Sequence, residues 1–390
     1  WGDGHVENFS SGDTATHFYN YATIPGSTLT SRGYKQVVVT VIPQNGMHLT
    51  SIDLSLGSDL ITNDYPVAPW LDIAMSLPNA DSGRSILLDG YENGYVSPYA
   101  YPNTLERLQI LNAGNATDFS WLVYTESALQ VFVLGPNVVD NFNGFTYSYV
   151  LNTIKLQNTT LDCVYNVLDS VNNFYEYSRG YLGVSLYMTN ISSDADVSYY
   201  LYEFNSIRKI VIDGMPDAVN MQGFLEDCYY LESAYISNIP NVNYTYDLFY
   251  YCPALKTVVI GDCPALTDAD YMFDTCESLV NVQIGNTPLL EYAYSMFYEC
   301  YSLIKAPQLN MSSVTDASYM FEYCYSLQEV PDYVTPVLEY SYQMFYECSS
   351  LAKAPMLDLS HVTDANGMFE YCYNLRTVPA YDLSSCTDTY

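Results

Sequence analysis

Cysteine recurs at a fixed interval over the second half of this 390-residue chain. Seven cysteines stand 24 residues apart, and a leucine follows each of them three positions later. They are Cys228, Cys252, Cys276, Cys300, Cys324, Cys348 and Cys372. So strict a period is typical of a solenoid, whose repeats cannot bury their apolar faces alone and therefore stack on one another. The sequence thus predicts stacked coils that share one core.

Apolar residues occupy fixed offsets of −4, −3, 0 and +3 from each cysteine. In the copy QMFYECSSLAKAPML they are Met344, Phe345, Cys348 and Leu351. Residues three and four apart share one face of a helix, so the spacing predicts one or two helical turns with these side chains in the core. Tyr346 and Glu347 would then face water. The preceding motif VTDA or LTDA supplies a Thr or Asp that caps the start of such a helix.

After the leucine the apolar period changes to two, which predicts a short strand in each coil. Val258 with Ile260, and Val282 with Ile284, are the inward residues of two such strands. The pattern can be aligned upstream and downstream in steps of 22 to 30 residues. The aligned inward residues are Ile86, Leu108, Val131, Ile154, Val184 and Ile210 upstream, and Ala306, Val330, Ala354 and Val378 downstream. One coil is therefore a strand, a connection and a short helix.

These patterns divide the chain into three parts. Residues 1–80 are predicted to be a β-rich N-terminal region or cap, in which Ile52 and Leu54 belong either to a further coil or to the cap. Residues 81–206 are predicted to be irregular coils, and residues 207–390 to be regular coils with the 24-residue period.

Two long segments carry a family resemblance. They are SMFYECYSLIKAPQLNMSSVTDASYMFEYCYSL and QMFYECSSLAKAPMLDLSHVTDANGMFEYCYNLRTVPAYDLSSCTD. Both closely resemble the BspA-type leucine-rich repeats, over about residues 205 to 390 and more weakly upstream. The resemblance implies an α/β leucine-rich-repeat solenoid on a cell surface that adheres to host proteins, matrix proteins or other cells. It carries over no catalytic residue. The sequence departs from the family pattern because the strand proline appears only from Pro307 onward and because tyrosine is unusually frequent.

The charge of the chain argues against nucleic acids and anionic membranes as partners. Twelve basic against 44 acidic side chains give a formal net charge of −32 at pH 7, which repels nucleic-acid phosphates and anionic membranes. Because 49% of the residues are hydrophobic, the chain can bury a sizeable core, and the charge is a solvated coat rather than a sign of disorder. The sequence has no run of 18 apolar residues, so no membrane span is predicted. Trp1 in first position suggests a processed or excised chain.

The cysteine column has two interpretations. Equivalent residues on neighbouring coils lie about 5 Å apart, a distance that a disulfide could just span. Because seven cysteines in one column cannot all pair, we favour buried free thiols that act as small apolar groups over disulfides or metal binding. Cys386 takes the place of Val314 and Val362 in other coils and is expected to be core as well. We predict no cofactor and no metal, since the chain has no CxxC motif and its four histidines are scattered.

Tyrosine is the most suggestive surface feature, with 42 copies. Tyrosines and glutamates flank the repeat cysteines and are expected to form parallel columns of rings and carboxylates along the outer face. The candidate interaction surface comprises Tyr298, Tyr301, Tyr323, Tyr325, Tyr346, Tyr371, Tyr373, Glu299, Glu322, Glu347 and Glu370. Tyrosine suits protein interfaces and sugar contacts, but it could also merely cover the core and stack on the tyrosine of the next coil.

Other motifs add little. Carboxylates are so frequent that no general acid or base can be assigned, so we predict no enzyme. Six Asn-x-Ser/Thr sequons permit N-glycosylation in a suitable host. They stand at Asn8, Asn115, Asn158, Asn190, Asn243 and Asn310.

The favoured function is an extracellular binding or adhesion solenoid that presents its tyrosine-rich acidic surface to a protein or glycan. The expected location is extracellular, on a cell surface or on the exterior of a viral particle. The alternative is a structural subunit of a fibre, appendage or virion. Tyr390 falls within a coil, so we expect either that the natural protein continues or that a neighbouring copy covers the last coil with its strands around Val37 to Val41. The second option would propagate a head-to-tail assembly.

Overall fold

The computed structural model describes residues 6–8, 10, 52–53, 72–76, 86–87, 107–112, 129–135, 150–175 and 183–387. The chain divides into two compact units, Trp1–Leu49 and Thr50–Tyr390. Of the first unit, only residues 6–8 and 10 are described, and they are exposed. The strands proposed around Val37 to Val41 lie outside the described residues, and the boundaries near 80 and 206 stay predictions. The second unit holds the coils.

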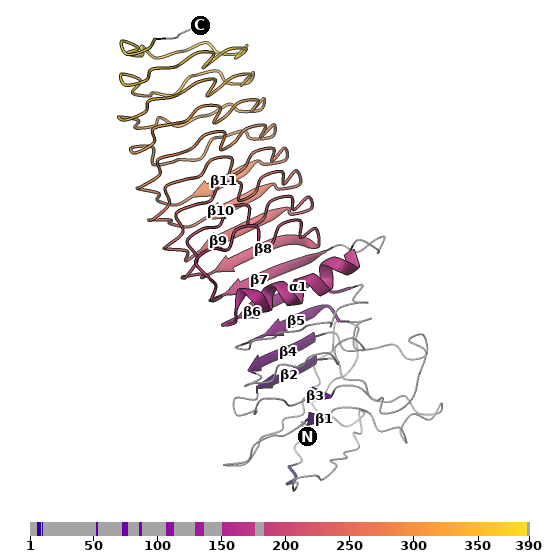
Figure 1. Ribbon diagram of the computed structural model, residues 1–390. Helices are drawn as coiled ribbons and strands as arrows, with labels where there is room; N and C mark the ends of the chain where they lie inside the picture. The colour runs from indigo at the N-terminus through magenta and orange to yellow at the C-terminus, as the bar shows by residue number, and fades with distance from the viewer. Residues whose placement is uncertain are drawn as a thin grey trace. The chain divides into compact units, whose positions relative to one another are not determined.

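Parallel strands form one side of the stacked coils (Figure 1). A nine-stranded parallel sheet has the order β11-β10-β9-β8-β7-β6-β5-β4-β2, and β1 pairs with β3 in a separate two-stranded sheet. The strands are β1 (Ile52–Asp53), β2 (Asp72–Ser76), β3 (Ile86–Leu87), β4 (Arg107–Asn112), β5 (Val131–Leu134), β6 (Thr153–Gln157), β7 (Val184–Thr189), β8 (Ile207–Asp213), β9 (Ser233–Ser237), β10 (Thr257–Ile260) and β11 (Asn281–Ile284). The predicted solenoid of parallel coils is therefore confirmed.

One α-helix, α1 (Leu161–Tyr175), is present among the described residues and connects β6 to β7. Its buried residues Leu161, Val164, Val167, Leu168 and Val171 recur at helical spacing. The hydroxyl of Thr160 accepts the N–H of Cys163 at 3.2 Å, an N-cap contact. The strand pattern alone does not predict this helix, although the helical spacing of its apolar residues is plain in the sequence.

The register of the irregular coils differs from the predicted alignment at three residues. Ile86 lies in β3 and pairs with Ile52, whereas β2 takes the place beside β4. In β5, Phe132 rather than Val131 pairs with Leu108 and Ile154. In β7, Leu186 rather than Val184 pairs with Ile154 and Ile210. The sequence of β5, VFVL, is apolar throughout, so it does not show which residues face the core. The register of this strand therefore depends on the neighbouring strands.

Prolines end the regular sheet. Beyond β11 the strand side of the coils makes only isolated bridges, Lys305 to Glu329 and Lys353 to Thr377. These coils carry Pro307, Pro331, Pro355 and Pro379, and a proline has no N–H to donate to a neighbouring strand. The strands predicted at Ala306, Val330, Ala354 and Val378 are therefore absent as regular elements. Ala306 and Ala354 are still buried, but Val378 is 52% exposed.

The segment predicted to be helical is a run of turns. We call the eight residues that end at the repeat cysteine the turn segment, for instance 269–276. Its N–H groups alternate between two kinds of partner. Those of Tyr271, Phe273 and Thr275 donate to carbonyls of the next coil at 2.8–2.9 Å. Those of Asp274 and Cys276 donate to the carbonyl three residues earlier, at 3.0 and 3.1 Å. Neighbouring coils thus bond to each other on the turn side as well as through strands.

Two residues in each turn segment have a left-handed backbone, at offsets −5 and −1 from the cysteine. In the coil of Cys276 they are Tyr271 at φ 54° and Thr275 at φ 57°. Glycine fills these positions only twice, at Gly223 and Gly367. A side chain in this conformation costs roughly 1–2 kcal/mol, so the coil-to-coil hydrogen bonds must outweigh that cost in most coils.

Replacing Gly223 with alanine should reduce the free energy of unfolding by about 1–2 kcal/mol, the cost of a left-handed side chain. The added Cβ would also clash with the ring of Tyr199, so that ring must move. Gly261→Ala is the control, because a Cβ there meets no atom nearer than 3.6 Å and its φ is not left-handed. Urea denaturation measures both variants, and equal destabilisation by the two would contradict the argument.

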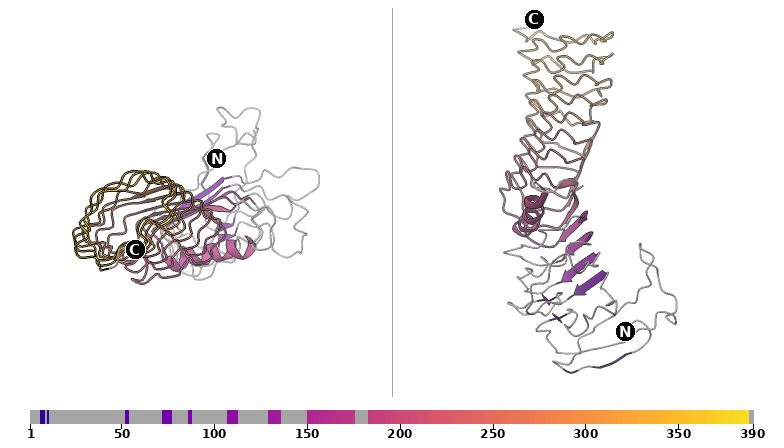
Figure 2. Two further views of the ribbon diagram at one scale, coloured as in Figure 1. Left: turned by 90° about the horizontal axis from the view of Figure 1, so that it is seen from above. Right: turned by 90° about the vertical axis from the view of Figure 1, so that its right-hand side faces the viewer.

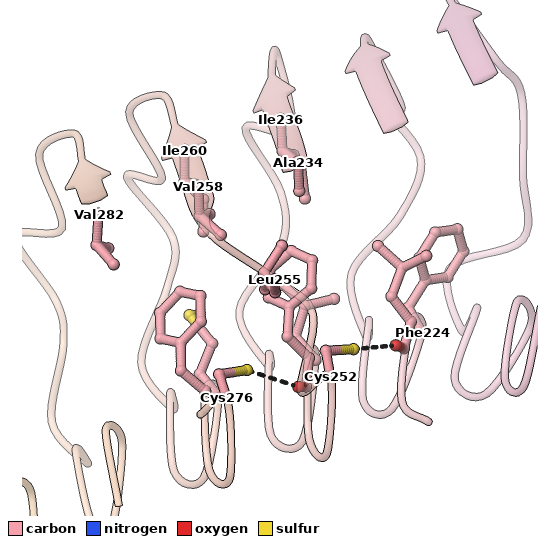
Figure 3. Close-up of a cluster of buried hydrophobic side chains, with 14 of the residues drawn as sticks. Phe224, Ala234, Ile236, Cys252, Leu255, Val258, Ile260, Cys276 and Val282 are labelled. Atoms are coloured by element: carbon pink, nitrogen blue, oxygen red, sulfur yellow. Dashed lines mark hydrogen bonds between the residues drawn. The ribbon is translucent and has the colours of Figure 1, made fainter. Parts of the chain in front are cut away.

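The core lies between the strands and the turn segments (Figure 3). All four predicted inward residues of one coil, Met344, Phe345, Cys348 and Leu351, are 0% exposed. The rings at offset −3 stack from coil to coil, with centroids 5.1–5.5 Å apart from Phe249 to Phe369. Seen from above, the regular coils superimpose closely (Figure 2), which is why equivalent residues meet in columns.

Candidate functional site

The seven repeat cysteines are structural. Their thiols are free and buried, and each Sγ–H donates to a main-chain carbonyl of the previous coil at 3.0–3.4 Å. Figure 3 shows this contact for Cys252 and Cys276. Burial raises the pKa of Cys228 to about 12 and that of Cys252 well above its ordinary value, so the reactive thiolate is suppressed. The predicted column of buried thiols is confirmed. Cys386 is half-buried against the core.

The predicted interaction residues lie along the turn side of the coils. Exposed are Tyr325, Tyr371, Tyr373 and Glu370, and half-buried are Tyr298, Tyr301, Tyr323, Tyr346, Glu299 and Glu347. Four of these rings touch edge to face in sequence, with centroids 5.2–5.7 Å apart. We call Tyr298, Tyr323, Tyr346 and Tyr371 the outer tyrosine column.

Glu322 departs from the prediction, because it is 5% exposed rather than on the surface. Tyrosine and carboxylate do not form separate columns but exchange places from one coil to the next. At offset −2 the order is Asp274, Tyr298, Glu322, Tyr346, Glu370, and at offset −1 it is Thr275, Glu299, Tyr323, Glu347, Tyr371. Acids in one column are thereby about 10 Å apart instead of about 5 Å, which halves their direct repulsion. Glu322 also has a tyrosine on either side of it in its column, and these rings shield its carboxyl group from water.

Several acids on this side are held in poorly solvated surroundings. Burial raises the pKa of Asp274 and Glu322 to about 7. Burial, together with neighbouring carboxylates, also raises the pKa of Asp247 and Asp270 to about 7. One oxygen of Glu322, Oε2, is buried without a hydrogen-bond partner, as expected where the carboxyl is hard to ionise. The charge on the turn side therefore changes with pH near neutrality, through these four carboxyl groups.

A second set of tyrosines, which the prediction missed, lies at offsets −6 and −5. Tyr246, Tyr271, Tyr294, Tyr319 and Tyr342 alternate between the two offsets and pack ring to ring at 5.1–5.2 Å. We call them the inner tyrosine column. The signal in the sequence is the alternation YD, DY, YS, SY, YQ from one repeat to the next, which has a period of 48 residues and is hidden in a 24-residue alignment.

Beside it, at offset −8, parallel bridges join one residue of each coil to the next. This bridge column alternates tyrosine with aspartate, in the order Tyr244, Asp268, Tyr292, Asp316, Tyr340, Asp364. The three tyrosines are 41–46% exposed. Each aspartate accepts the N–H two residues later through Oδ1, at 2.8–3.0 Å, which fixes the direction of the carboxylate.

The two columns enclose a shallow depression of about 420 Å³. Its lining residues are Tyr294, Asp316, Ser318, Tyr319, Tyr340, Tyr342 and Asp364. We call it the turn-side groove. Among residues 183–387, no cysteine, histidine, aspartate or glutamate cluster there has the geometry of a metal centre. Aromatic faces and carboxylates can hold a cationic or hydroxylated ligand.

Comparison with known families decides the nature of the repeats. Residues 245–376 match six copies of the family described as BspA type leucine rich repeat region. This part of the chain is a BspA-type leucine-rich repeat array. The array includes the bridge column from Asp268 onward, the turn-side groove and all four residues of the outer tyrosine column. No curated protein matches the chain.

Three solved structures are similar to this chain at low identity. A leucine-rich repeat protein from Bacteroides ovatus ATCC 8483 is 14% identical over 91% of this chain and 90% of its own, with a TM-score of 0.35. An internalin from Listeria monocytogenes is 13% identical over 71% of this chain and 68% of its own, with a TM-score of 0.33. A leucine rich cell surface protein from Faecalibacterium prausnitzii A2-165 is 14% identical over 65% of this chain and 83% of its own, with a TM-score of 0.18.

The remaining predicted sites are the six N-glycosylation sequons, of which only that at Asn310 lies within residues 245–376. Asn8, Asn158 and Asn190 are exposed, Asn243 and Asn310 are half-buried, and Asn115 lies outside the described residues. Nδ2 of Asn190 donates to Oδ1 of Asn158 at 2.8 Å, so these two sequons are neighbours. Glycosylation stays a prediction. Within the described ranges, no helix has the length and hydropathy needed to cross a bilayer.

Proposed function

We propose that the BspA-type array is an extracellular or cell-surface binding module that uses its turn side to hold a protein or glycan partner. The observation that carries this proposal is the pair of aromatic columns, which continue ring to ring over successive coils. Rings that pack on one another are already immobilised, so a partner pays little side-chain entropy to contact them. The role is non-enzymatic, in keeping with a repeat family that typically carries no catalytic residues.

The test is binding of the 390-residue protein to a panel of purified extracellular-matrix proteins and to a glycan array. Replacing Tyr323, Tyr346 and Tyr371 together with serine should weaken the binding found by at least tenfold. In a matched variant, serine replaces Tyr187, Tyr230 and Tyr235, which lie outside the two tyrosine columns. This variant should bind as tightly as the parent protein. If no probe binds, the proposed function is wrong; if both variants bind like the parent protein, the outer tyrosine column is not the binding site.

A second proposal is end-to-end stacking of copies into a fibre. It is supported by the uniformity of the coil edges, since equivalent donors such as Phe297 and Phe321 bond to the following coil at the same distance of 2.9 Å. An edge that repeats in this way suits a contact that propagates without closing. Electron micrographs at high protein concentration should show fibres, and short single particles alone would reject this proposal.

A further inference from the structure

The turn-side groove has a charge pattern that the proposed function does not use. Asp316 and Asp364 face it together with Tyr340 and the inner tyrosine column, and no basic side chain lines it. In the part of the chain between residues 183 and 387, the recorded ion pairs are Lys256 with Glu232 and Lys305 with Glu329. All four of those residues lie on the strand side of the coils, and each ion pair joins two neighbouring coils. The groove carboxylates therefore have no internal cation.

Each groove aspartate has one oxygen committed and one available. Oδ1 of Asp316 accepts the N–H of Ser318 at 2.8 Å, and Oδ1 of Asp364 accepts the N–H of Asn366 at 3.0 Å. Oδ2 of each makes no hydrogen bond to the protein in this part of the structure. Between the two aspartates stands Tyr340, which is 46% exposed. A carboxylate beside an aromatic face is the combination that attracts an arginine or lysine side chain, through an ion pair and a cation–π contact.

The spacing of these groups selects the conformation of a ligand. Because aspartate alternates with tyrosine, the bridge column presents a carboxylate every two coils, which is about 9.6 Å for a coil spacing of about 4.8 Å. A polyproline II helix has three residues per turn and a rise of about 3.1 Å, so every third side chain recurs on one face at about 9.3 Å. A β-strand repeats a face at about 6.8 Å. In an α-helix, side chains seven residues apart lie on the same face at a distance of about 10.5 Å. Polyproline II fits best.

We propose that the turn-side groove binds a basic peptide in the polyproline II conformation, aligned with the stack of coils and carrying arginine or lysine at every third position. The basic side chains meet Asp316, Asp364 and, one step further along the column, Asp268. Prolines of the peptide pack on Tyr340 and the inner tyrosine column, since flat aromatic surfaces suit the ridges of this helix. This inference rests on the proposed binding function and names one class of partner for it.

The test uses a fluorescent twelve-residue peptide, (Arg-Pro-Pro)4, with the 390-residue protein. Its control has the same composition, four arginines and eight prolines, but unequal spacing of the arginines. Fluorescence anisotropy should show at least tenfold tighter binding of the regular peptide, and weaker binding as salt screens the charges. The charge-reversed peptide (Glu-Pro-Pro)4 should not bind. Equal affinity for the regular and irregular peptides would overturn the match in spacing.

Variants place the peptide in the groove. Asp316→Asn with Asp364→Asn keeps an Oδ1 for the turn hydrogen bonds but removes two charges, and should weaken binding at least tenfold. Glu232→Gln with Glu329→Gln removes two strand-side charges and should leave the affinity unchanged. Tyr340→Phe should bind like the parent protein, whereas Tyr340→Ser should bind several-fold more weakly.

The outcomes separate this inference from the proposed function. If a matrix protein or glycan binds through the outer tyrosine column and the peptide does not bind, the groove inference alone is wrong. A neutral glycan could instead bind the groove: if Tyr340→Ser weakens its binding and the paired aspartate variant does not, the groove is a sugar site and the peptide inference is overturned. If the peptide binds equally well to the paired aspartate variant, binding occurs elsewhere and the assignment to the groove fails.

Discussion

Replacing Phe345 with alanine is expected to reduce the free energy of unfolding by about 3–5 kcal/mol, the range for a buried aromatic side chain. The ring is 0% exposed and stacks between Phe321 and Phe369, with centroids 5.5 and 5.3 Å away. Its loss leaves a cavity that two neighbouring coils share. Because each repeat contacts only its neighbours, the interfaces on both sides of the coil weaken together.

Glu347→Gln is the control for this prediction. Glu347 is half-buried, lies two residues from Phe345 on the turn side and should change stability by no more than about 0.5 kcal/mol. Urea denaturation followed by circular dichroism compares the two variants with the parent protein. Similar shifts of the denaturation midpoint in both would mean that the inward and outward faces of the turn segment are wrongly assigned.

Acidification from pH 8 to pH 5 is expected to raise the unfolding temperature. Burial raises the pKa of Asp274 and Glu322 to about 7, and that of Asp247 and Asp270 to about 7 with help from neighbouring carboxylates. A carboxyl whose pKa is raised on folding holds its proton more tightly in the folded state. Its contribution to stability is therefore complete below its unfolded pKa near 4 and is lost as the pH rises through 7.

The high net negative charge acts in the same direction, because protonation relieves repulsion in the compact state. Hydrogen bonds from Ser360 and Ser384 lower the pKa of Asp358 and Asp382, so these groups oppose the trend only below about pH 4. Differential scanning calorimetry at half-unit pH steps would measure the effect. An unfolding temperature that falls between pH 8 and pH 5 would contradict it.

A paired variant identifies the groups responsible. Asp274→Asn with Glu322→Gln replaces two buried acids, 7% and 5% exposed, by neutral amides of the same shape. It should be more stable than the parent protein at pH 8 and should show a smaller change between pH 8 and pH 5. Glu329→Gln, on an exposed strand-side residue, should leave the pH profile unchanged. If the paired variant keeps the full pH dependence, other groups cause it.

The inward residues could be predicted from the sequence because a solenoid tolerates little freedom in its core. Met344, Phe345, Cys348 and Leu351 follow from apolar offsets alone, and all are fully buried. Val258, Ile260 and Val282 follow from strand alternation and are buried too. Where alternation is lost, as in the VFVL run of β5, the register cannot be derived locally.

The backbone of the turn segment could not be predicted in the same way. Offsets of three and four residues fit an α-helix, yet the same residues face inward in a run of turns that bonds to the next coil. The left-handed residues that make this possible are Tyr271, Thr275 and their equivalents, of which only Gly223 and Gly367 are glycine, so the usual sequence signal is missing from most coils. The strands predicted beyond β11 are absent for a different reason. The prolines from Pro307 onward have no N–H to donate to a neighbouring strand, and this outweighs the apolar alternation.

The candidate surface was predicted in outline only. The residues around the cysteines do lie on the turn side, but the alternation of tyrosine with carboxylate has a period of two coils and was missed. That alternation buries Glu322, builds the inner tyrosine column and spaces Asp316 from Asp364. The alternation is carried by a 48-residue period in the sequence, which a 24-residue alignment hides.

Site-resolved thiol labelling tests the central claim most directly. The claim is that the repeat cysteines point into a shared core with tyrosines and carboxylates on the turn side. Under native conditions at pH 8, a thiol reagent followed by mass spectrometry should modify the half-buried Cys386 first and leave Cys252, Cys276, Cys300, Cys324 and Cys348 unmodified until the protein unfolds. Rapid modification of those five thiols in the folded protein would contradict the account.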